Sequence, residues 1–318
     1  MLLLICSLGY SQYTLIPDPN FEGYLVNVGI DTDGLVNGQV LTSDIADELE
    51  LFLLMGNQIT DLTGIEDFEN LENLTIVQMD ILEINLTQNN NLKFLSLSDV
   101  SLESIDLSAN SNLLEFKYEA NYEGSIFTSP ITNIDLNNNV QLTKVIFNST
   151  NITELNLENN INLVRIILLR MNELIEIDLN NGFNEDILFL EIKNNPLLQC
   201  LQVDDPDAVI AGIIPPYDNW TFENNPLLTI TDDCNLGLEE VALNQIILYP
   251  NPTLEILKID NSSDYQIKNI KVYSVLGSLV FEEDNPINQI DLSNLSKGVV
   301  FIKIETSKGV LVKKFIKK

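Results

Sequence analysis

A pair of apolar residues, separated by one position, returns every ten or eleven residues from about residue 49 to residue 203. A fixed spacing of this kind is typical of a solenoid, in which each repeat buries its apolar side only against its neighbours. A solenoid presents a long side surface and seldom encloses a deep catalytic cavity, so the pattern favours binding over catalysis. The repeated pairs are Leu74/Ile76, Ile84/Leu86, Leu95/Leu97, Ile105/Leu107, Phe116/Tyr118, Ile134/Leu136, Val145/Phe147, Leu155/Leu157, Ile166/Leu168, Ile177/Leu179, Leu190/Ile192 and Leu201/Val203.

Two kinds of repeat alternate, so one full coil takes about 21 residues and about seven coils fit between residues 49 and 203. The first kind reads Leu-x-x-Leu-x-Leu-x-x-Asn-x-Ile and is clearest at Leu49, Phe52, Leu54, Asn57 and Ile59. The second kind is almost uniform: INLTQN at 84–89, IDLSAN at 105–110, IDLNNN at 134–139, LNLENN at 155–160 and IDLNNG at 177–182.

The first kind of repeat resembles the consensus of the leucine-rich repeat family. The resemblance implies that each Leu-x-Leu pair is a short β-strand with both leucines pointing inward, and that stacked strands form a parallel sheet on the concave side. It also implies that the Asn bonds backbone groups inside the coil. Four coils carry Met79, Val100, Thr150 and Met171 at that position, so we expect an incomplete Asn ladder. The second kind implies a further short parallel ladder on the opposite side.

Charge is distributed unevenly along the 318 residues, whose net charge is −31. Residues 1–240 hold 39 of the 47 acidic and 6 of the 16 basic residues, a net charge of −33, whereas residues 241–318 carry +2. Such a break marks a domain boundary, and the acidic part should repel nucleic acid. The chain has no His, which excludes Ser-His-Asp triads and His-ligated zinc. Paired carboxylates could still hydrolyse glycosides, but no motif marks such a pair, and we predict no catalytic residue.

The outward positions differ between the two kinds of repeat. Those of the second kind are uniform, which suits a structural ladder: Asn85, Asp106, Asp135, Asn156 and Asp178. Those of the first kind mix Arg and Lys with aromatic and aliphatic groups, as interface cores do. We predict that this variable face binds a partner, as the family resemblance also implies; a merely solvated sheet is the alternative. The predicted binding residues are Phe94, Ser96, Lys117, Lys144, Ile146, Arg165, Ile167, Leu169, Phe189, Glu191 and Lys193.

One coil is longer than the others, because the step from Phe116 to Ile134 takes 18 residues where 10 are expected. The added residues include Tyr122 and Phe127. Insertions in solenoids form loops on one face, often one that contacts the ligand. We predict an insertion loop that contributes Tyr122 and Phe127 to binding; a tolerated surface loop is the alternative.

The N-terminal residues predict export. Residues 1–11 hold a short apolar stretch followed by Gly9 and Ser11, which is typical of a secretory signal peptide that lacks its basic start; a frayed apolar tail is the alternative. Residues 13–48 predict an N-terminal cap with a short amphipathic helix, and they resemble the caps of secreted leucine-rich repeat proteins of Bacteroidota. Asp31 and Asp33 resemble the start of a calcium loop, but Thr42 stands where such a loop needs Glu, so no metal is predicted.

Three cysteines are present, and Cys6 falls in the signal peptide. Cys200 and Cys234 remain as a pair in an exported chain, where disulfides persist. They flank much of residues 204–240, which we interpret as a C-terminal cap and linker to the solenoid of residues 49–203. We predict a disulfide between them; two free buried thiols are the alternative. No stretch has the roughly 18 uninterrupted apolar residues of a membrane helix, and no cofactor is predicted.

From residue 241 the apolar pattern changes to period two, which predicts a small antiparallel β-sandwich of seven strands. We expect these strands near 245–249, 254–260, 267–274, 278–282, 288–292, 299–306 and 309–316. The motifs LYPNP at 248–252, IKVYSVLGSLV at 270–280 and IDLSNLSKGVVFIKI at 290–304, with the closing KKFIKK, resemble the C-terminal sorting domain of type IX secretion cargo. Val300 departs from the family pattern, which usually has Tyr there. The resemblance implies that residues 241–318 guide passage through the type IX translocon.

The sequence therefore predicts a mainly β protein: a leucine-rich repeat solenoid followed by an Ig-like antiparallel β-sandwich. We expect a non-enzymatic protein that is secreted or displayed on the outer-membrane cell surface and that recognises an unknown protein or glycan in adhesion. One alternative is a carbohydrate-handling accessory protein or a glycoside hydrolase that uses carboxylates alone. Another is a structural protein of a surface coat.

Overall fold

The computed structural model describes residues 13–54, 58–120, 130–234, 246–261, 266–284, 289–306 and 310–318. The expected signal peptide, Asn57, Tyr122 and Phe127 lie outside the described residues. The chain divides into two compact units: Met1–Thr150 with Asn159–Arg165, and Asn151–Glu158 with Ile166–Lys318.

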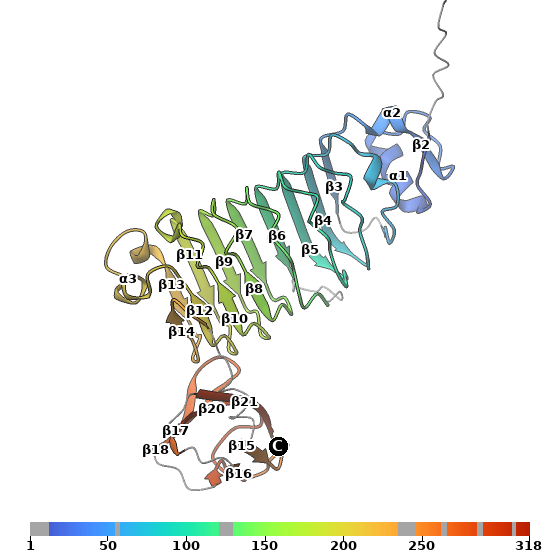
Figure 1. Ribbon diagram of the computed structural model, residues 1–318. Coiled ribbons are helices and arrows are strands. Elements are labelled where there is room, and N and C mark those ends of the chain that lie inside the picture. Colours follow the sequence, from blue (N-terminus) through green and yellow to red (C-terminus); the bar gives the residue numbers. More distant parts are fainter. Residues whose placement is uncertain are drawn as a thin grey trace, which may run out of the picture. The chain divides into compact units, whose positions relative to one another are not determined.

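The first-kind repeats supply an eight-stranded sheet of order β13-β11-β9-β7-β6-β5-β4-β3 (Figure 1). Pairing is parallel from β3 to β7 and between β11 and β13, and Leu74 lies opposite Leu95. From Leu74/Ile76 to Leu190/Ile192 the inward residues of the predicted first-kind pairs are at most 2% exposed, which confirms those assignments. The strands are β3 (Glu50–Leu53), β4 (Asn73–Met79), β5 (Phe94–Val100), β6 (Glu115–Glu119), β7 (Lys144–Asn148), β9 (Arg165–Leu169), β11 (Phe189–Lys193) and β13 (Thr221–Glu223).

The prediction for the first coil was wrong by one residue. Leu51 and Leu53 are fully buried and lie opposite Leu74 and Ile76. Phe52 and Leu54, which the consensus placed inward, are each 49% exposed, and Leu49 is 50% exposed. A shift of one residue along a strand moves a side chain to the other face of the sheet, so Phe52 joins the outward positions.

Most sheet strands end in a tight turn through one non-glycine residue with a left-handed backbone. Its φ is 55° at Gln78, 52° at Asp99, 58° at Ser149, 54° at Arg170 and 61° at Asn194. Each of these residues lies two positions after the second inward residue of its strand. The left-handed conformation is uncommon outside glycine, so its recurrence marks one equivalent backbone position, at or near the end of the strand, in each of these coils.

The second-kind repeats form a four-stranded sheet of order β14-β12-β10-β8 in the second unit. Its strands are β8 (Glu154–Asn156), β10 (Glu176–Asp178), β12 (Cys200–Gln202) and β14 (Thr229–Thr231), all paired in parallel. The predicted second ladder is therefore confirmed only there. At 84–86, 105–107 and 134–136 the chain forms no strand, and Ile84, Ile105 and Ile134 are only half-buried.

The uniform outward residues of the second-kind repeats form side-chain hydrogen bonds within their own turns. The side-chain oxygen of Asp106 accepts the N–H of Ser108 at 2.9 Å, and Asp135 does the same for Asn137. The Ser108 hydroxyl and N–H together lower the pKa of Asp106. Equivalent bonds form at the corresponding positions of three other coils, so this row has the structural role that its uniformity predicts: Asn85, Asn156 and Asp178.

Buried asparagines link each coil to the one before it. The Asn110 side chain, 0% exposed, donates to the carbonyls of Leu86 at 3.0 Å and Asn89 at 2.9 Å. Asn139 repeats the arrangement one coil later, with Leu107 and Asn110 as its acceptors. Asn89 and Asn160, both also 0% exposed, complete the row in the first unit.

This ladder does not lie at the consensus position of the first-kind repeat. It follows the second-kind segments, while Met79, Val100 and Thr150 fill the consensus position and are at most 2% exposed. In the second unit Met171, 0% exposed, still fills the consensus position, and the Asn returns one coil later. There the Asn195 side chain accepts the N–H of Met171 at 2.9 Å and donates to the carbonyl of Leu168. The consensus ladder is thus incomplete, as expected, and a second row replaces it.

The N-terminal cap consists of β1 (Tyr13–Leu15), helix α1 (Pro19–Val28), β2 (Gln39–Leu41) and α2 (Thr42–Ile45), and η1 (Ile65–Asp67) follows in the first coil. The predicted amphipathic helix is α1. Its Phe21 and Leu25 are fully buried, and the Phe21 ring stacks on Phe68 at 6.3 Å. Val28, which the spacing placed on the apolar face, is 51% exposed at the end of the helix.

Asp18 joins this cap to the first coil. One carboxylate oxygen accepts the N–H groups of Asn20 and Phe21 at the start of α1. The other accepts the N–H groups of Thr60 and Asp61, at 2.8 and 3.1 Å. Burial acts to raise the pKa of Asp18, but these four N–H groups outweigh burial and hold the pKa below its usual value.

The segment after residue 203 both caps the solenoid and extends it. It contains α3 (Pro206–Ala211) and η3 (Tyr217–Asn219), and then β13 and β14 add one strand to each sheet. The repeats thus continue to Thr231 and not only to residue 203. Cys200 and Cys234 form the predicted disulfide around this segment. The Trp220 indole donates to the carbonyl of Ile187, which follows η2 (Asn184–Asp186).

The C-terminal residues form the predicted sandwich, and all seven expected strands are present. One sheet has the order β15-β16-β19 and the other β18-β17-β20-β21, with every pair antiparallel. Buried residues of both sheets, such as Leu257 and Ile302, share one core. The strands are β15 (Ile246–Tyr249), β16 (Ile256–Asn261), β17 (Ile267–Ser274), β18 (Leu279–Asp284), β19 (Gln289–Asp291), β20 (Gly298–Thr306) and β21 (Val310–Lys317).

The LYPNP motif and the Thr253 that follows it form hydrogen bonds to the last strand of this domain. The Asn251 side chain accepts the N–H of Ile316 at 3.0 Å, and the Thr253 N–H donates to the Ile316 carbonyl at 2.8 Å. Val300, where the sequence departs from the family pattern, is 5% exposed in the core. It also lines a hollow of about 440 Å³ with Val275 and Val280.

We predict that Asn110→Ala lowers the free energy of unfolding by about 1–3 kcal/mol, because it removes two buried hydrogen bonds to carbonyl groups that then keep only the backbone N–H donors of Asn89 and Leu92. The matched control is Asn112→Ala. Its exposed amide donates one bond, to Asn90, so its loss should cost less than about 1 kcal/mol. Urea denaturation of both variants measures the difference, and equal losses would contradict the buried ladder.

We predict that Asp18→Asn destabilises the cap by about 1–3 kcal/mol at neutral pH, because a charged acceptor of four N–H groups becomes neutral. A carboxyl whose folded pKa is lowered contributes stability above its unfolded pKa and loses it as pH falls through the folded pKa. The difference between wild type and variant should therefore shrink as urea titrations move from about pH 6 toward pH 2. A difference independent of pH would contradict the role of the charge.

We predict that replacing Cys200 and Cys234 with Ser lowers stability by about 3–4 kcal/mol, the loop-closure value for their separation of 34 residues. Reductant should give wild type the same thermal shift and leave the double variant unchanged. A reductant effect that persists in the double variant would show that the shift has another source.

Candidate binding face

The outward residues of the first unit lie in straight rows across β3 to β7. One row consists of residues that lie opposite one another on successive strands: Phe52, Thr75, Ser96, Lys117 and Ile146. Neighbouring members are about 4.8 Å apart, the spacing of paired strands. The adjacent row contains Glu50, Asn73, Phe94, Glu115 and Lys144. We name these two rows the outer face.

A shallow hollow lies in the middle of the outer face. Its volume is about 110 Å³, and we name it the Phe94 hollow. Phe94 is 39% exposed, which is more than any other apolar residue among the predicted binding residues of the sheet. The hollow brings together six outward residues of the four neighbouring strands β4 to β7. Its lining comprises Leu74, Thr75, Phe94, Leu95, Ser96, Glu115, Phe116, Lys117 and Lys144.

The lysines around the hollow are paired with carboxylates. Lys144 Nζ lies 2.7 Å from Glu115, and Lys117 Nζ lies 2.6 Å from Glu119. Such partly exposed pairs add little stability, but they cancel the charge of the face. The sequence predicts these lysines as members of a mixed binding face, and the structure shows that each has an anionic neighbour.

The other predicted binding residues also point outward from their strands. Arg165 is exposed at the start of β9. In the second unit Ile167, Leu169 and Phe189 are half-buried. There Lys193 lies 2.9 Å from Glu191 and 3.0 Å from Glu223, and its hydrogen bonds to these two carboxylates raise its pKa. The structure thus places all the described predicted residues on outward positions, while their role in binding stays a prediction.

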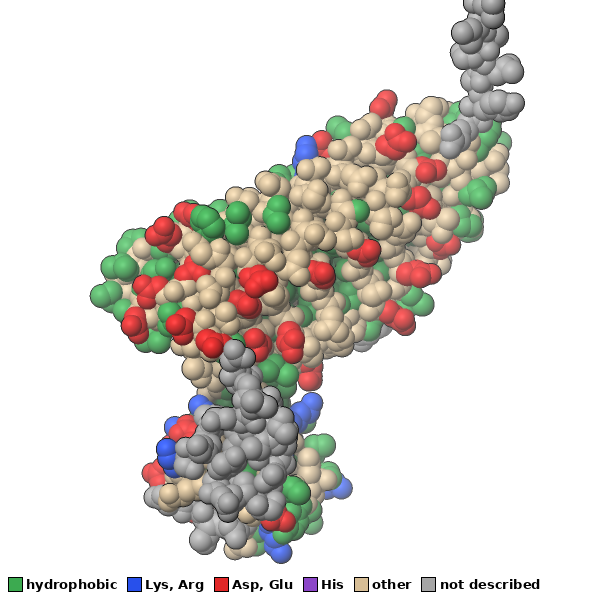
Figure 2. Space-filling view, in the orientation of Figure 1, with side chains coloured by type: hydrophobic (Ala, Val, Ile, Leu, Met, Phe, Trp, Pro, Cys, Tyr) green, Lys and Arg blue, Asp and Glu red, His purple; other side chains and the backbone are tan. Residues whose placement is uncertain are grey.

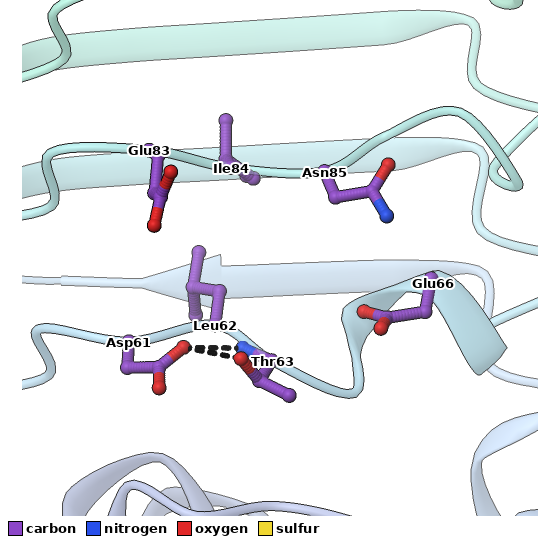
Figure 3. A pocket seen from close by; sticks show the side chains of 7 residues that line it. All are labelled: Asp61, Leu62, Thr63, Glu66, Glu83, Ile84 and Asn85. Carbon is purple, nitrogen blue, oxygen red and sulfur yellow. Dashed lines mark hydrogen bonds between the residues drawn. The ribbon is translucent and has the colours of Figure 1, made fainter.

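A second hollow, of about 280 Å³, lies between the first two coils at their second-kind segments. Figure 3 shows Asp61 bonded to Thr63, with Glu66 and Glu83 nearby. Glu66 accepts the N–H of Gly64 at 2.9 Å. Two carboxylates of this hollow, those of Asp61 and Glu66, are therefore already hydrogen-bonded within their own turns. Within the described residues, no group of three or more His, Cys, Asp or Glu side chains could hold a metal ion. This hollow therefore offers less to a ligand than the Phe94 hollow.

Sequence reasoning missed Phe52 and Val77 on the face of the sheet. The β3 sequence Glu-Leu-Phe-Leu carries apolar residues in both phases, so alternation alone does not fix its register. Counting back from the unambiguous pair Leu74/Ile76 by strand pairing would have identified Leu51 as inward and Phe52 as outward.

The charge division of the sequence is visible on the surface. Acidic side chains are scattered over the solenoid, and Lys and Arg side chains gather on the C-terminal domain (Figure 2). Among the described residues no helix is long and apolar enough to cross a membrane.

Residues 247–318 match the family described as "Secretion system C-terminal sorting domain". The sandwich is therefore a type IX sorting domain, and the chain is secreted or displayed at the cell surface. No curated protein sequence matches the chain.

Two solved structures of Listeria monocytogenes proteins are similar to the chain. Internalin C2 is 17% identical, with 70% of this chain and 99% of that chain covered and a TM-score of 0.37. The internalin inlF is 15% identical, with 70% and 93% covered and a TM-score of 0.29. At these scores the likeness carries no argument, and the solenoid assignment rests on the strand register and the buried repeat positions.

The fold and the family match together define an exported protein that joins a leucine-rich-repeat-like solenoid to a secretion sorting domain.

Proposed function

We propose that the protein is a non-enzymatic binding protein, exported by the type IX system of a member of the Bacteroidota, that recognises a protein or a glycan with its outer face. Residues 241–318 engage the translocon. The solenoid then presents its outer face outside the cell, where it acts in adhesion or in contact with another cell.

The observation that carries this proposal is the contrast between the two sides of the repeats. The second-kind side uses its polar groups internally, because each Asp or Asn bonds the turn of its own coil. The outer face instead varies from strand to strand and exposes Phe52 and Phe94 beside short hydroxyl side chains. Variable side chains on a rigid sheet are suited to recognition of a specific partner.

The hydrolase alternative has less support than binding. Glycoside hydrolysis needs two carboxylates that face one substrate across about 5–9.5 Å. At the Phe94 hollow, Glu115 and its neighbour Glu119 are both held by lysines. The surface-coat alternative also has less support, because a coat has no need of the exposed aromatic rings of Phe52 and Phe94 on one face.

We predict that Ile146→Asp reduces binding to an array of proteins and glycans at least about tenfold, because it places a charge in a mixed row of the outer face. The matched control is Val140→Asp, an exposed aliphatic residue of the same coil outside the sheet. The full-length secreted protein is applied to the array, and its thermal unfolding is measured in parallel.

Since Ile146 is half-buried, Ser96→Arg provides a second variant at a polar position of the same row. It should fold as wild type and lose the same array signal. Unchanged binding by folded Ile146→Asp and Ser96→Arg proteins would refute the outer face as the binding surface.

A further inference from the structure

The Phe94 hollow has a specific combination of groups. An exposed aromatic ring, Phe94, stands in register beside the carboxylate of Glu115 on the neighbouring strand. The next row supplies the hydroxyl groups of Thr75 and Ser96, directly opposite one another on neighbouring strands. An apolar ring is thus surrounded by short groups that donate and accept hydrogen bonds.

We propose that the Phe94 hollow binds one neutral hexopyranose unit of a polysaccharide. The inference rests on the proposed function and deepens it by naming the class of ligand. The C–H face of the sugar ring packs on Phe94, and the hydroxyl rim of the sugar bonds to Thr75, Ser96 and Glu115.

Charge is the first argument for a neutral ligand. The hollow and its margin contain Lys117, Lys144, Glu115 and Glu119, which form two ion pairs at 2.6 and 2.7 Å. A site for an anion would leave cationic groups without an acidic partner, and a site for a cation would leave carboxylates free of lysine. The residues 1–240 carry a net charge of −33, which further opposes acidic polysaccharides.

Hydrogen-bonding capacity is the second argument. Within the described part of the chain, the hydroxyl groups of Thr75 and Ser96 bond to no protein group, and Glu115 uses only one of its carboxylate oxygens for Lys144. These groups are therefore available to a ligand rich in hydroxyl groups, which can both donate to a carboxylate and accept from a hydroxyl.

Size and shape are the third argument. At about 110 Å³ the hollow is much smaller than the roughly 300–1,000 Å³ pockets that enclose drug-sized ligands. It suits a single ring that rests against the sheet while the rest of a chain molecule extends over neighbouring strands. A protein partner could also place a side chain here, but it would gain little from a ring of short hydroxyl groups around one aromatic residue.

The test uses affinity electrophoresis of the full-length secreted protein in native gels that contain laminarin, mannan or galactomannan as neutral probes and alginate as an acidic probe. We expect retardation by at least one neutral polysaccharide and none by alginate. Phe94→Ala should weaken the retardation at least about tenfold, whereas Phe94→Trp should retain it. The matched control is Phe183→Ala, which removes a ring of similar exposure, 44%, outside the sheet.

Two outcomes would overturn the inference: no retardation by any of the three neutral polysaccharides, or retardation that Phe94→Ala leaves unchanged in a folded protein. The array experiment separates this failure from failure of the proposed function. If array signals on proteins or charged glycans still depend on Ile146, the sugar inference is wrong and the binding function stands. If no signal depends on Ile146, both are wrong.

Discussion

The structure depends on hydrogen bonds from buried asparagine amides to the carbonyl groups of the preceding coil. Where each coil turns, backbone carbonyls face the interior, and each buried hydrogen bond to such a group contributes about 0.5–1.5 kcal/mol. The side chains of Asn110 and Asn139 each donate to two such carbonyls, which also accept a backbone N–H of their own turn. Because these bonds join successive coils, they also fix the offset of one coil on the next, and with it the register of the sheet.

Fixed register determines what each face of the coil can do. With inward residues locked against their neighbours, the intervening residues stand in rows at the strand spacing. On the second-kind side the rows of Asp and Asn are occupied by their own turns. The outer face is therefore where this chain can vary side chains without disturbing the coil, and it is there that Phe94, Ser96 and Lys117 meet.

Much of the fold could be predicted because repetition averages out local ambiguity. Twelve apolar pairs agree on one spacing, and the seven C-terminal strands follow from alternation and turns. Where a single element stood alone, prediction failed: β3 is apolar in both phases, and Phe52 was placed on the wrong side. The position of the Asn ladder was also missed, because each second-kind segment ends in several consecutive Asn or polar residues and only burial distinguishes Asn110 or Asn139 from its neighbours.

The sequence predicted which residues of the candidate site face outward, but it did not predict which of their side chains form ion pairs. Alternation correctly placed Phe94, Ile146 and Lys193 on outward positions. Pairing of Lys144 with Glu115 joins residues 29 apart in the sequence, and it could be found only once the strand register was known. That pairing shows that the positive charges of the face are balanced by neighbouring carboxylates.

Register is the central claim, and disulfide trapping tests it directly. Ser96 and Lys117 lie opposite one another on adjacent strands, about 4.8 Å apart, within the span that a disulfide bridges. Ser96 and Ile146 lie two strands apart in the same row, about twice that distance. Under mild oxidation, peptide mass spectrometry should find a crosslink in the Ser96→Cys, Lys117→Cys variant and none in the Ser96→Cys, Ile146→Cys variant. A crosslink only in the second variant, or in neither while the protein is folded, would contradict the stacking described here.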